Sequence, residues 1–180
     1  MLPKIVVLAG VAGSGKSTIA AELVKHGYQV VKFAGLLKDM IRALGLTDAE
    51  IEGDLKEKPC ALLGGQTPRH AMQTLGTEWG RELIARDIWV NAWRRKVEAV
   101  LASGGRVVVD DCRFPNELNA ALALGGVAVR LVRDGAGTVA HASESGLDEV
   151  KMPVVYNDHL PPCVAGDLLR LLPVIAPCRC

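Results

Sequence analysis

The feature that most constrains this chain is a glycine-rich octapeptide between a strand-like run and a helix-like run. Residues 10–17 read GVAGSGKS and match the phosphate-loop pattern G-x-x-x-x-G-K-[ST]. Before them, residues 4–9 (KIVVLA) form an apolar run typical of a strand buried on both faces. After them, Lys16–Lys25 has helical spacing, with Ile19 and Leu23 four residues apart. A strand before the loop and a helix after it are the context that this pattern requires, so the sequence predicts a nucleoside triphosphate site.

The residue types of the loop suit the chemistry of phosphate binding. Small residues let the backbone curl and direct its N–H groups inward, and the following helix adds its positive end. Lys16 is expected to reach the β- and γ-phosphates, Ser17 to ligate Mg²⁺ and Thr18 to contact the α-phosphate. The predicted ATP-binding residues are Gly10, Ala12, Gly13, Ser14, Gly15, Lys16, Ser17 and Thr18.

A triphosphate with bound Mg²⁺ usually needs a carboxylate at the end of a neighbouring strand. Asp110 and Asp111 directly follow the apolar residues 107–109. Successive strand residues face opposite sides, so only one of the two should point at the metal. A turn or helix-capping role is the alternative for either aspartate.

Strand-like and helix-like segments alternate along the chain. The expected strands are residues 4–9, 29–33, 106–109, 127–132 and 154–156, and the expected helices are Lys16–Lys25, 36–44, one starting at Thr67-Pro68, 88–102, 115–124 and 164–172. This alternation predicts an α/β fold with a parallel five-stranded sheet between two layers of helices. Residues 46–86 and 134–151 do not fit simple crossovers, and such excursions are often functional lids.

The composition excludes several classes of protein. A net charge of +1 over 180 residues and 4% aromatic residues argue against nucleic-acid binding. No run of about 18 apolar residues occurs, so no membrane span is expected. The apolar N-terminal run leads into the glycine loop and not into a cleavage site, so no secretory signal is expected. The length suits one domain, and the 49% hydrophobic content permits a homodimer.

Cysteine usage indicates a cytoplasmic protein. An odd count and scattered spacing argue against a disulfide framework; the positions are Cys60, Cys112, Cys163, Cys178 and Cys180. The last two lack a nearby histidine or second cysteine pair, so we interpret them as part of a tail rather than as a metal site.

Among phosphate-loop proteins, a small kinase fits this chain better than a GTPase switch, because no N-K-x-D motif occurs. Phosphoryl transfer depends on cations placed around both substrates. The candidate cations are Lys38, Arg69, Arg81, Arg113, Arg130 and Arg133. Each of them alone could instead be a solvated surface charge, as we expect for residues 94–96 (RRK) on the outer face of a helix.

Two longer motifs carry a specific resemblance. Residues 67–83 read TPRHAMQTLGTEWGREL and residues 107–118 read VVVDDCRFPNEL. With FAGLLKDM, DIWVNAW and HASE at residues 33–40, 87–93 and 141–144, they resemble the deoxynucleoside monophosphate kinases of tailed bacteriophages, which are adenylate-kinase-like P-loop kinases. The resemblance runs in order from the phosphate loop to about residue 158, where residues 157–162 (NDHLPP) depart from the family's Asn-Asp-Gly-Thr.

The resemblance implies one kinase domain, residues 1–180, with parts of different function. Its core would be residues 1–33 and 104–180, its helical monophosphate-binding segment about 34–90 and its short lid about 133–151. The implied acceptor-binding residues are Lys38, Arg69, Gln73, Arg81, Trp89, Arg113, Asn116 and Glu117. Some have an alternative interpretation: Trp89, like Trp79, also suits a hydrophobic core, and Asn116 and Glu117 also suit the N-terminus of a helix.

The same resemblance favours Asp111 over Asp110, so the implied metal ligands are Ser17 and Asp111. Arg133 at the lid entrance would stabilise the migrating phosphoryl group, which makes Lys16, Asp111 and Arg133 the implied catalytic residues. His141 is expected to be structural, because an anionic acceptor needs no general base.

The expected reaction is Mg²⁺-dependent transfer of phosphate from ATP to a deoxynucleoside 5′-monophosphate. The expected partners are small nucleotides, and neither nucleic acid nor a membrane. A kinase for another small acceptor, and a nucleotide-binding switch without catalysis, remain alternatives. Several arginines favour a phosphate acceptor over a hydroxyl acceptor, and the accepted bases stay open.

Overall fold

The computed structural model describes residues 2–136, 146–147 and 149–175. Its strands are β1 (Ile5–Ala9), β2 (Tyr28–Val30), β3 (Arg106–Val109), β4 (Val127–Val132) and β5 (Val154–Tyr156). Its helices are α1 (Lys16–Lys25), α2 (Gly35–Ala43), α3 (Asp48–Ile51), η1 (Asp54–Glu57), η2 (Ala61–Leu63), α4 (Pro68–Thr74), η3 (Leu75–Ile84), α5 (Ile88–Ala102), α6 (Pro115–Ala123) and α7 (Pro161–Ile175).

The chain divides into two compact units. Unit 1 comprises Met1–Lys32 and Arg94–Cys180 and contains the sheet, and unit 2 is the continuous segment Phe33–Trp93. The segment that the sequence assigns to monophosphate binding, residues 34–90, falls within unit 2. The phosphate loop and the residues after β3 and β4 fall within unit 1.

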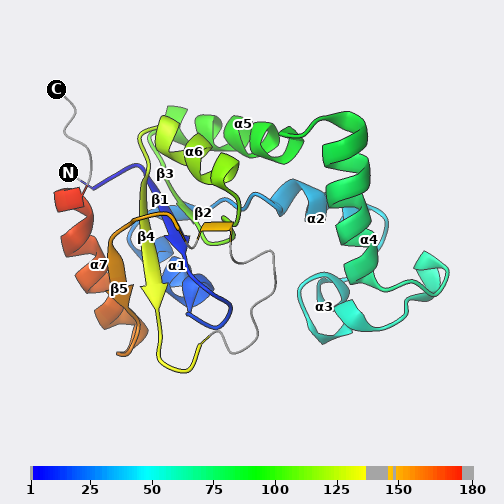
Figure 1. The fold of residues 1–180 in the computed structure, drawn as a ribbon, viewed down its shortest axis with the longest axis horizontal. Helices are drawn as coiled ribbons and strands as arrows, with labels where there is room; N and C mark the ends of the chain where they lie inside the picture. Colours follow the sequence, from blue (N-terminus) through cyan, green and yellow to red (C-terminus); the bar gives the residue numbers. More distant parts are fainter. Residues whose placement is uncertain (1, 137–145, 148, 176–180) are drawn as a thin grey trace. The chain divides into compact units, whose positions relative to one another are not determined.

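The sheet of unit 1 is entirely parallel, with strand order β2-β3-β1-β4-β5 (Figure 1). Strand β1 is buried along its whole length. Because side chains alternate, Val6 and Leu8 enter a core with α1 and α7, whereas Ile5 faces the turn after α6, near Gly126. Helices therefore cover both faces, and the predicted α/β fold with a five-stranded parallel sheet is confirmed.

Two elements of unit 1 differ from their predicted bounds by more than one residue, whereas β1 and α6 each differ by one residue at one end. Strand β2 covers Tyr28–Val30 and not residues 29–33. Val31 still donates to the carbonyl of Val108, and the next side chain, Lys32, pairs with Asp110. Helix α7 begins at Pro161 and not at residue 164. Prolines fit the first turn of a helix, where the backbone amides have no intrahelical acceptor, so residues 161 and 162 extend the helix.

Unit 2 is built from short helices around a small core. Ile41, Leu46 and Ile51 are buried in it. Thr67 caps α4 as its sequence predicts: its hydroxyl accepts a bond from the amide of His70, 3.1 Å away, and proline follows in the first turn. Helix α4 continues directly into η3, which has π-helical hydrogen bonding. Across the described part of the chain, no helix combines the length and apolarity that a membrane span requires.

Candidate nucleotide-binding site

The phosphate loop lies between β1 and α1 in unit 1. Gly13 and Gly15 have φ angles of +79° and +88°, which L side chains rarely adopt, so glycine is required at these bends. The Lys16 ammonium donates to the carbonyls of Gly10, at 2.6 Å, and Val11, at 2.8 Å. These bonds hold the cation on the loop, where the sequence predicts its contact with phosphate.

The loop exposes its predicted polar ligands at the start of α1. Ser17 and Thr18 are exposed, whereas Ser14 is fully buried. Within the part of the chain that the structure describes, the hydroxyl of Ser14 has no hydrogen-bond partner. The exposed Ser17 hydroxyl can therefore reach a ligand of the loop, and Ser14 faces the protein interior.

The interior side of the loop meets Asn157, which the sequence analysis did not select. Its side-chain amide donates to the carbonyl of Ser14 at 2.8 Å, and the bond is buried. A Cβ added at Gly15 would overlap this amide. On its other side, a Cβ at Gly10 would overlap the carbonyl of Leu131 in β4. Glycine is thus needed at both positions for close approach as well as for conformation.

The two aspartates after β3 have different surroundings. Asp110 has a side chain only 4% exposed, and its carboxylate pairs with Lys32 at 3.2 Å. Its second oxygen has no hydrogen-bond partner among the described residues. Asp111 is half-buried.

These residues fit a magnesium ion by their chemistry. Mg²⁺ prefers oxygen ligands, and unit 1 offers the exposed Ser17 hydroxyl and two carboxylates at the end of β3. One carboxylate oxygen of Asp110 is buried without a hydrogen-bond partner among the described residues, so it is available as a ligand for a cation. Both aspartates stay candidate ligands: the resemblance favours Asp111, and the buried oxygen without a partner among the described residues supports Asp110.

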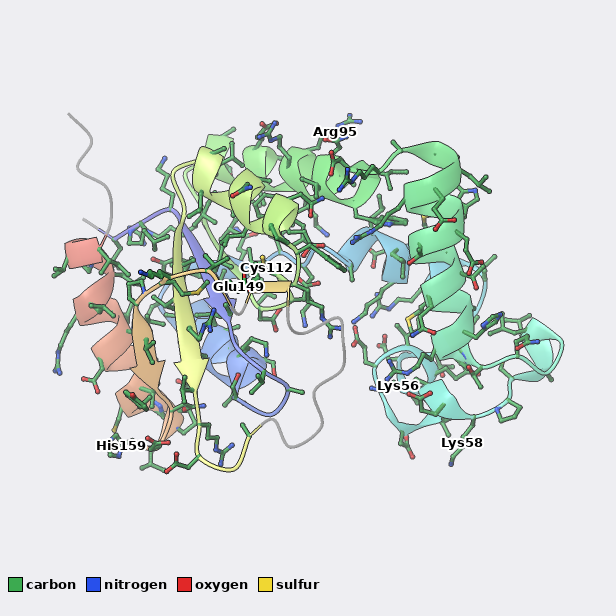
Figure 2. The ribbon with its side chains drawn as sticks, viewed as in Figure 1. Lys56, Lys58, Arg95, Cys112, Glu149 and His159 are labelled. Carbon is green, nitrogen blue, oxygen red and sulfur yellow. The ribbon has the colours of Figure 1, made fainter. Side chains whose placement is uncertain are left out.

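The segment after Asp111 is held by Glu117, at the N-terminus of α6. Glu117 is 3% exposed, and its carboxylate accepts from the amides of Arg113, at 2.8 Å, and Phe114, at 3.2 Å. Glu117 therefore caps the N-terminus of α6, in agreement with the alternative interpretation from the sequence. Burial raises the pKa of the neighbouring Cys112 thiol, and Glu117 and Asp111 raise it further, so this thiol stays neutral (Figure 2).

Arg130, in β4, and Arg133, directly after β4, differ in their surroundings. Arg130 donates to the backbone carbonyls of Leu147 and Val150, so it anchors described residues in the last part of the predicted lid. Arg133, the predicted catalytic arginine, is exposed. The rest of the predicted lid, including His141, lies outside the described residues, as do Cys178 and Cys180.

In unit 2, carboxylates pair with two of the basic side chains that were predicted to bind the acceptor phosphate. The Lys38 ammonium bonds both oxygens of Glu52, at 2.8 and 2.7 Å. Arg69 pairs with Glu57 through its Nε. Both glutamates belong to the acidic segment around α3 and η1. All four side chains are at least one-fifth exposed, so an anionic ligand can exchange with the carboxylates.

The two tryptophans near η3 have unequal exposure. Trp89 is 4% exposed, and its indole N–H donates to the carbonyl of Gly76 at 2.8 Å. Trp79, at 6.3 Å between ring centroids, is 37% exposed. Trp89 therefore belongs to the core of unit 2, in agreement with the alternative interpretation of its apolar position.

The other predicted acceptor residues vary in exposure. Gln73 and Arg113 are exposed, whereas Arg81 and Asn116 are half-buried. The basic run that we interpreted as solvated, residues 94–96, is exposed, and Arg95 points away from α5 (Figure 2).

Sequence reasoning missed three kinds of partner. They are Asn157 on the loop, Lys32 on Asp110, and the glutamates of α3 and η1 on the basic side chains of unit 2. Only Asn157 carried a signal, because a polar residue directly after a strand lies at the sheet edge where the loop also lies.

Comparison with known proteins identifies the family. The model of the deoxynucleotide monophosphate kinase family matches residues 65–160. A protein of Acanthamoeba polyphaga mimivirus, described provisionally as a deoxynucleotide monophosphate kinase, is 31% identical over 161 residues, which cover 82% of this chain and 83% of that protein.

Solved structures agree on the fold. The APS kinase of Mycobacterium tuberculosis in complex with AMPPNP and APS aligns with a TM-score of 0.52 and 17% identity, covering 96% of this chain and 98% of that one. An unliganded sugar kinase from Janibacter aligns with a TM-score of 0.50 and 14% identity, covering 97% and 96%. At these identities the likeness concerns the fold alone. From the family match and the mimivirus relative, the chain belongs to the deoxynucleotide monophosphate kinase family, whose members are phosphotransferases.

Proposed function

We propose that this chain transfers the γ-phosphoryl group of ATP to a deoxynucleoside 5′-monophosphate, giving ADP and the diphosphate. An oxygen of the acceptor phosphate forms the new bond to phosphorus as the bond to the bridging β-oxygen of ATP breaks. The observation that carries the proposal is a complete phosphate loop, with the Lys16 ammonium held on it, in a chain of this family.

On the donor side, unit 1 would bind and orient the triphosphate. The loop amides and the start of α1 surround phosphate oxygens, and Lys16 neutralises their charge. Mg²⁺, when bound by Ser17 and an aspartate after β3, supplies further positive charge at the phosphates. Arg133, exposed after β4, is the residue that we assign to the migrating phosphoryl group.

On the acceptor side, unit 2 supplies the cations. Lys38 and Arg69 already hold carboxylates, which are anions of similar size and charge to a phosphate edge. A monophosphate acceptor is itself anionic, so the reaction needs no general base. A hydroxyl acceptor would need one, and for this reason we favour the monophosphate.

The test is a coupled assay of ADP release over ribo- and deoxynucleoside monophosphates, with sugar hydroxyl acceptors included. We expect turnover with one or more deoxynucleoside monophosphates and none with the hydroxyl acceptors. Lys16→Ala should lower turnover by about 100-fold or more, because it removes a donor at the transferring phosphate. Lys25→Ala, on the same helix but paired only at the surface with Glu22, is the matched control and should leave turnover unchanged.

Two results would contradict the proposal. Tight ATP binding without turnover on any acceptor would indicate a nucleotide-binding switch. Turnover on hydroxyl acceptors alone would indicate a metabolite kinase of the same fold.

A further inference from the structure

Asn157 follows β5, and the sheet fixes its position. Its backbone amide donates to the carbonyl of Val132 at 2.7 Å, one step beyond the pairing of Val132 with Tyr156. The residue is 8% exposed, and His159, two residues later, marks the turn into α7 (Figure 2). The backbone at this point therefore belongs to the rigid core of unit 1.

The side chain of Asn157 reaches a loop that lies 143 residues away in sequence. Its amide nitrogen is 2.8 Å from the carbonyl oxygen of Ser14, in a buried contact. A Cβ at Gly15 would overlap the same nitrogen, so the amide lies directly against the loop backbone. The hydrogen bond and the close contact both favour the orientation in which the Ser14 carbonyl points at Asn157.

The orientation of that carbonyl has a consequence for the next amide. In a trans peptide the C=O and the following N–H point in opposite directions. If the Ser14 carbonyl points at Asn157, the N–H of Gly15 points to the opposite side of the loop. Backbone N–H groups on that side are what a phosphate loop uses to bind phosphate.

We propose that Asn157 is a positioning residue for the phosphate loop: by holding the Ser14 carbonyl, it orients the Ser14–Gly15 peptide so that the Gly15 N–H faces the triphosphate. This inference rests on the proposed function, since it assumes that the loop binds ATP. It assigns a role to Asn157, which lies just before the point, His159, where the sequence departs from the family pattern.

The proposal predicts a specific order of affinities for ATP. Asn157→Ala removes the donor and should weaken binding of a fluorescent non-hydrolysable ATP analogue by about 10-fold. Asn157→Asp keeps the size of the side chain but sets a carboxylate against the Ser14 carbonyl. It should therefore weaken binding more than Asn157→Ala does. Asn119→Ala, at an exposed position of α6, is the matched control and should bind like the wild type.

A positioning role also predicts a split between the two substrates. In Asn157→Ala, KM for ATP should rise while KM for the monophosphate stays within about two-fold of wild type. If Asn157 had only a structural role, Asn157→Ala would lower the urea midpoint of unfolding without raising KM for ATP alone. The affinities are measured on variants whose circular dichroism matches the wild type, and Asn157→Asp carries the test if Asn157→Ala does not fold.

The outcomes separate this inference from the proposed function. If the wild type binds the analogue and both variants bind it within two-fold, the inference is wrong. If the wild type binds the analogue and the variants lose affinity, but no monophosphate is phosphorylated, the proposed function fails and the inference stands. If the wild type does not bind the analogue, both fail.

Discussion

Replacing Glu117 by alanine tests whether this residue acts on the fold or on the acceptor. Its buried carboxylate accepts from two backbone amides at the start of α6, and both bonds are charge-assisted. Losing such a bond costs about 1.5–3 kcal/mol, and the longer one, at 3.2 Å, contributes least. The carboxylate also favours the positive end of the helix by about 0.3–1 kcal/mol. We therefore expect Glu117→Ala to lower the free energy of unfolding by about 2–4 kcal/mol.

The assay is urea unfolding followed by circular dichroism, together with KM for the monophosphate. Glu117→Gln keeps an acceptor oxygen but loses the charge, so it should cost about 1 kcal/mol. Glu98→Ala, at an exposed position of α5, is the control and should stay within about 0.5 kcal/mol of wild type. If Glu117→Ala unfolds like the wild type while KM rises about 10-fold or more, the capping argument is refuted and the residue acts on the acceptor.

Three further predictions concern unit 2. Glu52→Gln and Glu57→Gln each remove the carboxylate that pairs with Lys38 or Arg69. Each should lower KM for the monophosphate, measured by ADP release, by about 1.5- to 5-fold. An unchanged KM would mean that these cations do not contact the acceptor. Gly80→Ala would bring a Cβ within 2.6 Å of the Trp89 ring, so urea unfolding should register a loss of about 1–3 kcal/mol, and a neutral result would contradict the tight packing. The backbone amide and the hydroxyl of Thr47, at the N-cap of α3, lower the pKa of Glu50 below its usual 4.5. Its contribution to stability is therefore present above that value and lost as the pH falls through the lowered pKa. The difference in free energy of unfolding between wild type and Glu50→Gln should shrink as the pH falls below 4.5, and a constant difference would exclude this cause.

Local signals in the sequence were sufficient for most of the fold. Strand β4 and helix α1 have their predicted bounds, because the strand buries every second residue of a mostly apolar run and the helix buries apolar residues four apart. The cap at Thr67 was predicted for the same reason, since a side chain that bonds an amide three residues later depends on neighbours alone. The phosphate loop belongs with these, because its glycines satisfy local backbone requirements.

What the sequence could not predict depends on partners distant in the chain. Lys32, which follows β2, pairs with the buried carboxylate of Asp110, which follows the neighbouring strand β3. Nothing near Lys32 in sequence indicates this pair. The glutamate partners of Lys38 and Arg69 were missed because a polar, acidic segment can pair with many cations, and only the packing of short helices selects one. The contact of Asn157 with Ser14 joins residues that are 143 positions apart in the sequence.

The strand order has a consequence for how the protein is made. Strand β1 leaves the ribosome first, yet its two neighbours are β3 and β4, which begin about one hundred residues later. Strand β1 therefore stays unpaired until residues 106–132 have been synthesised. Until then its apolar side chains are exposed or make non-native contacts. Unit 2, by contrast, is one continuous segment with its own small core, so its contacts can form during synthesis. We expect unit 2 to gain structure before the phosphate loop that precedes it in the chain.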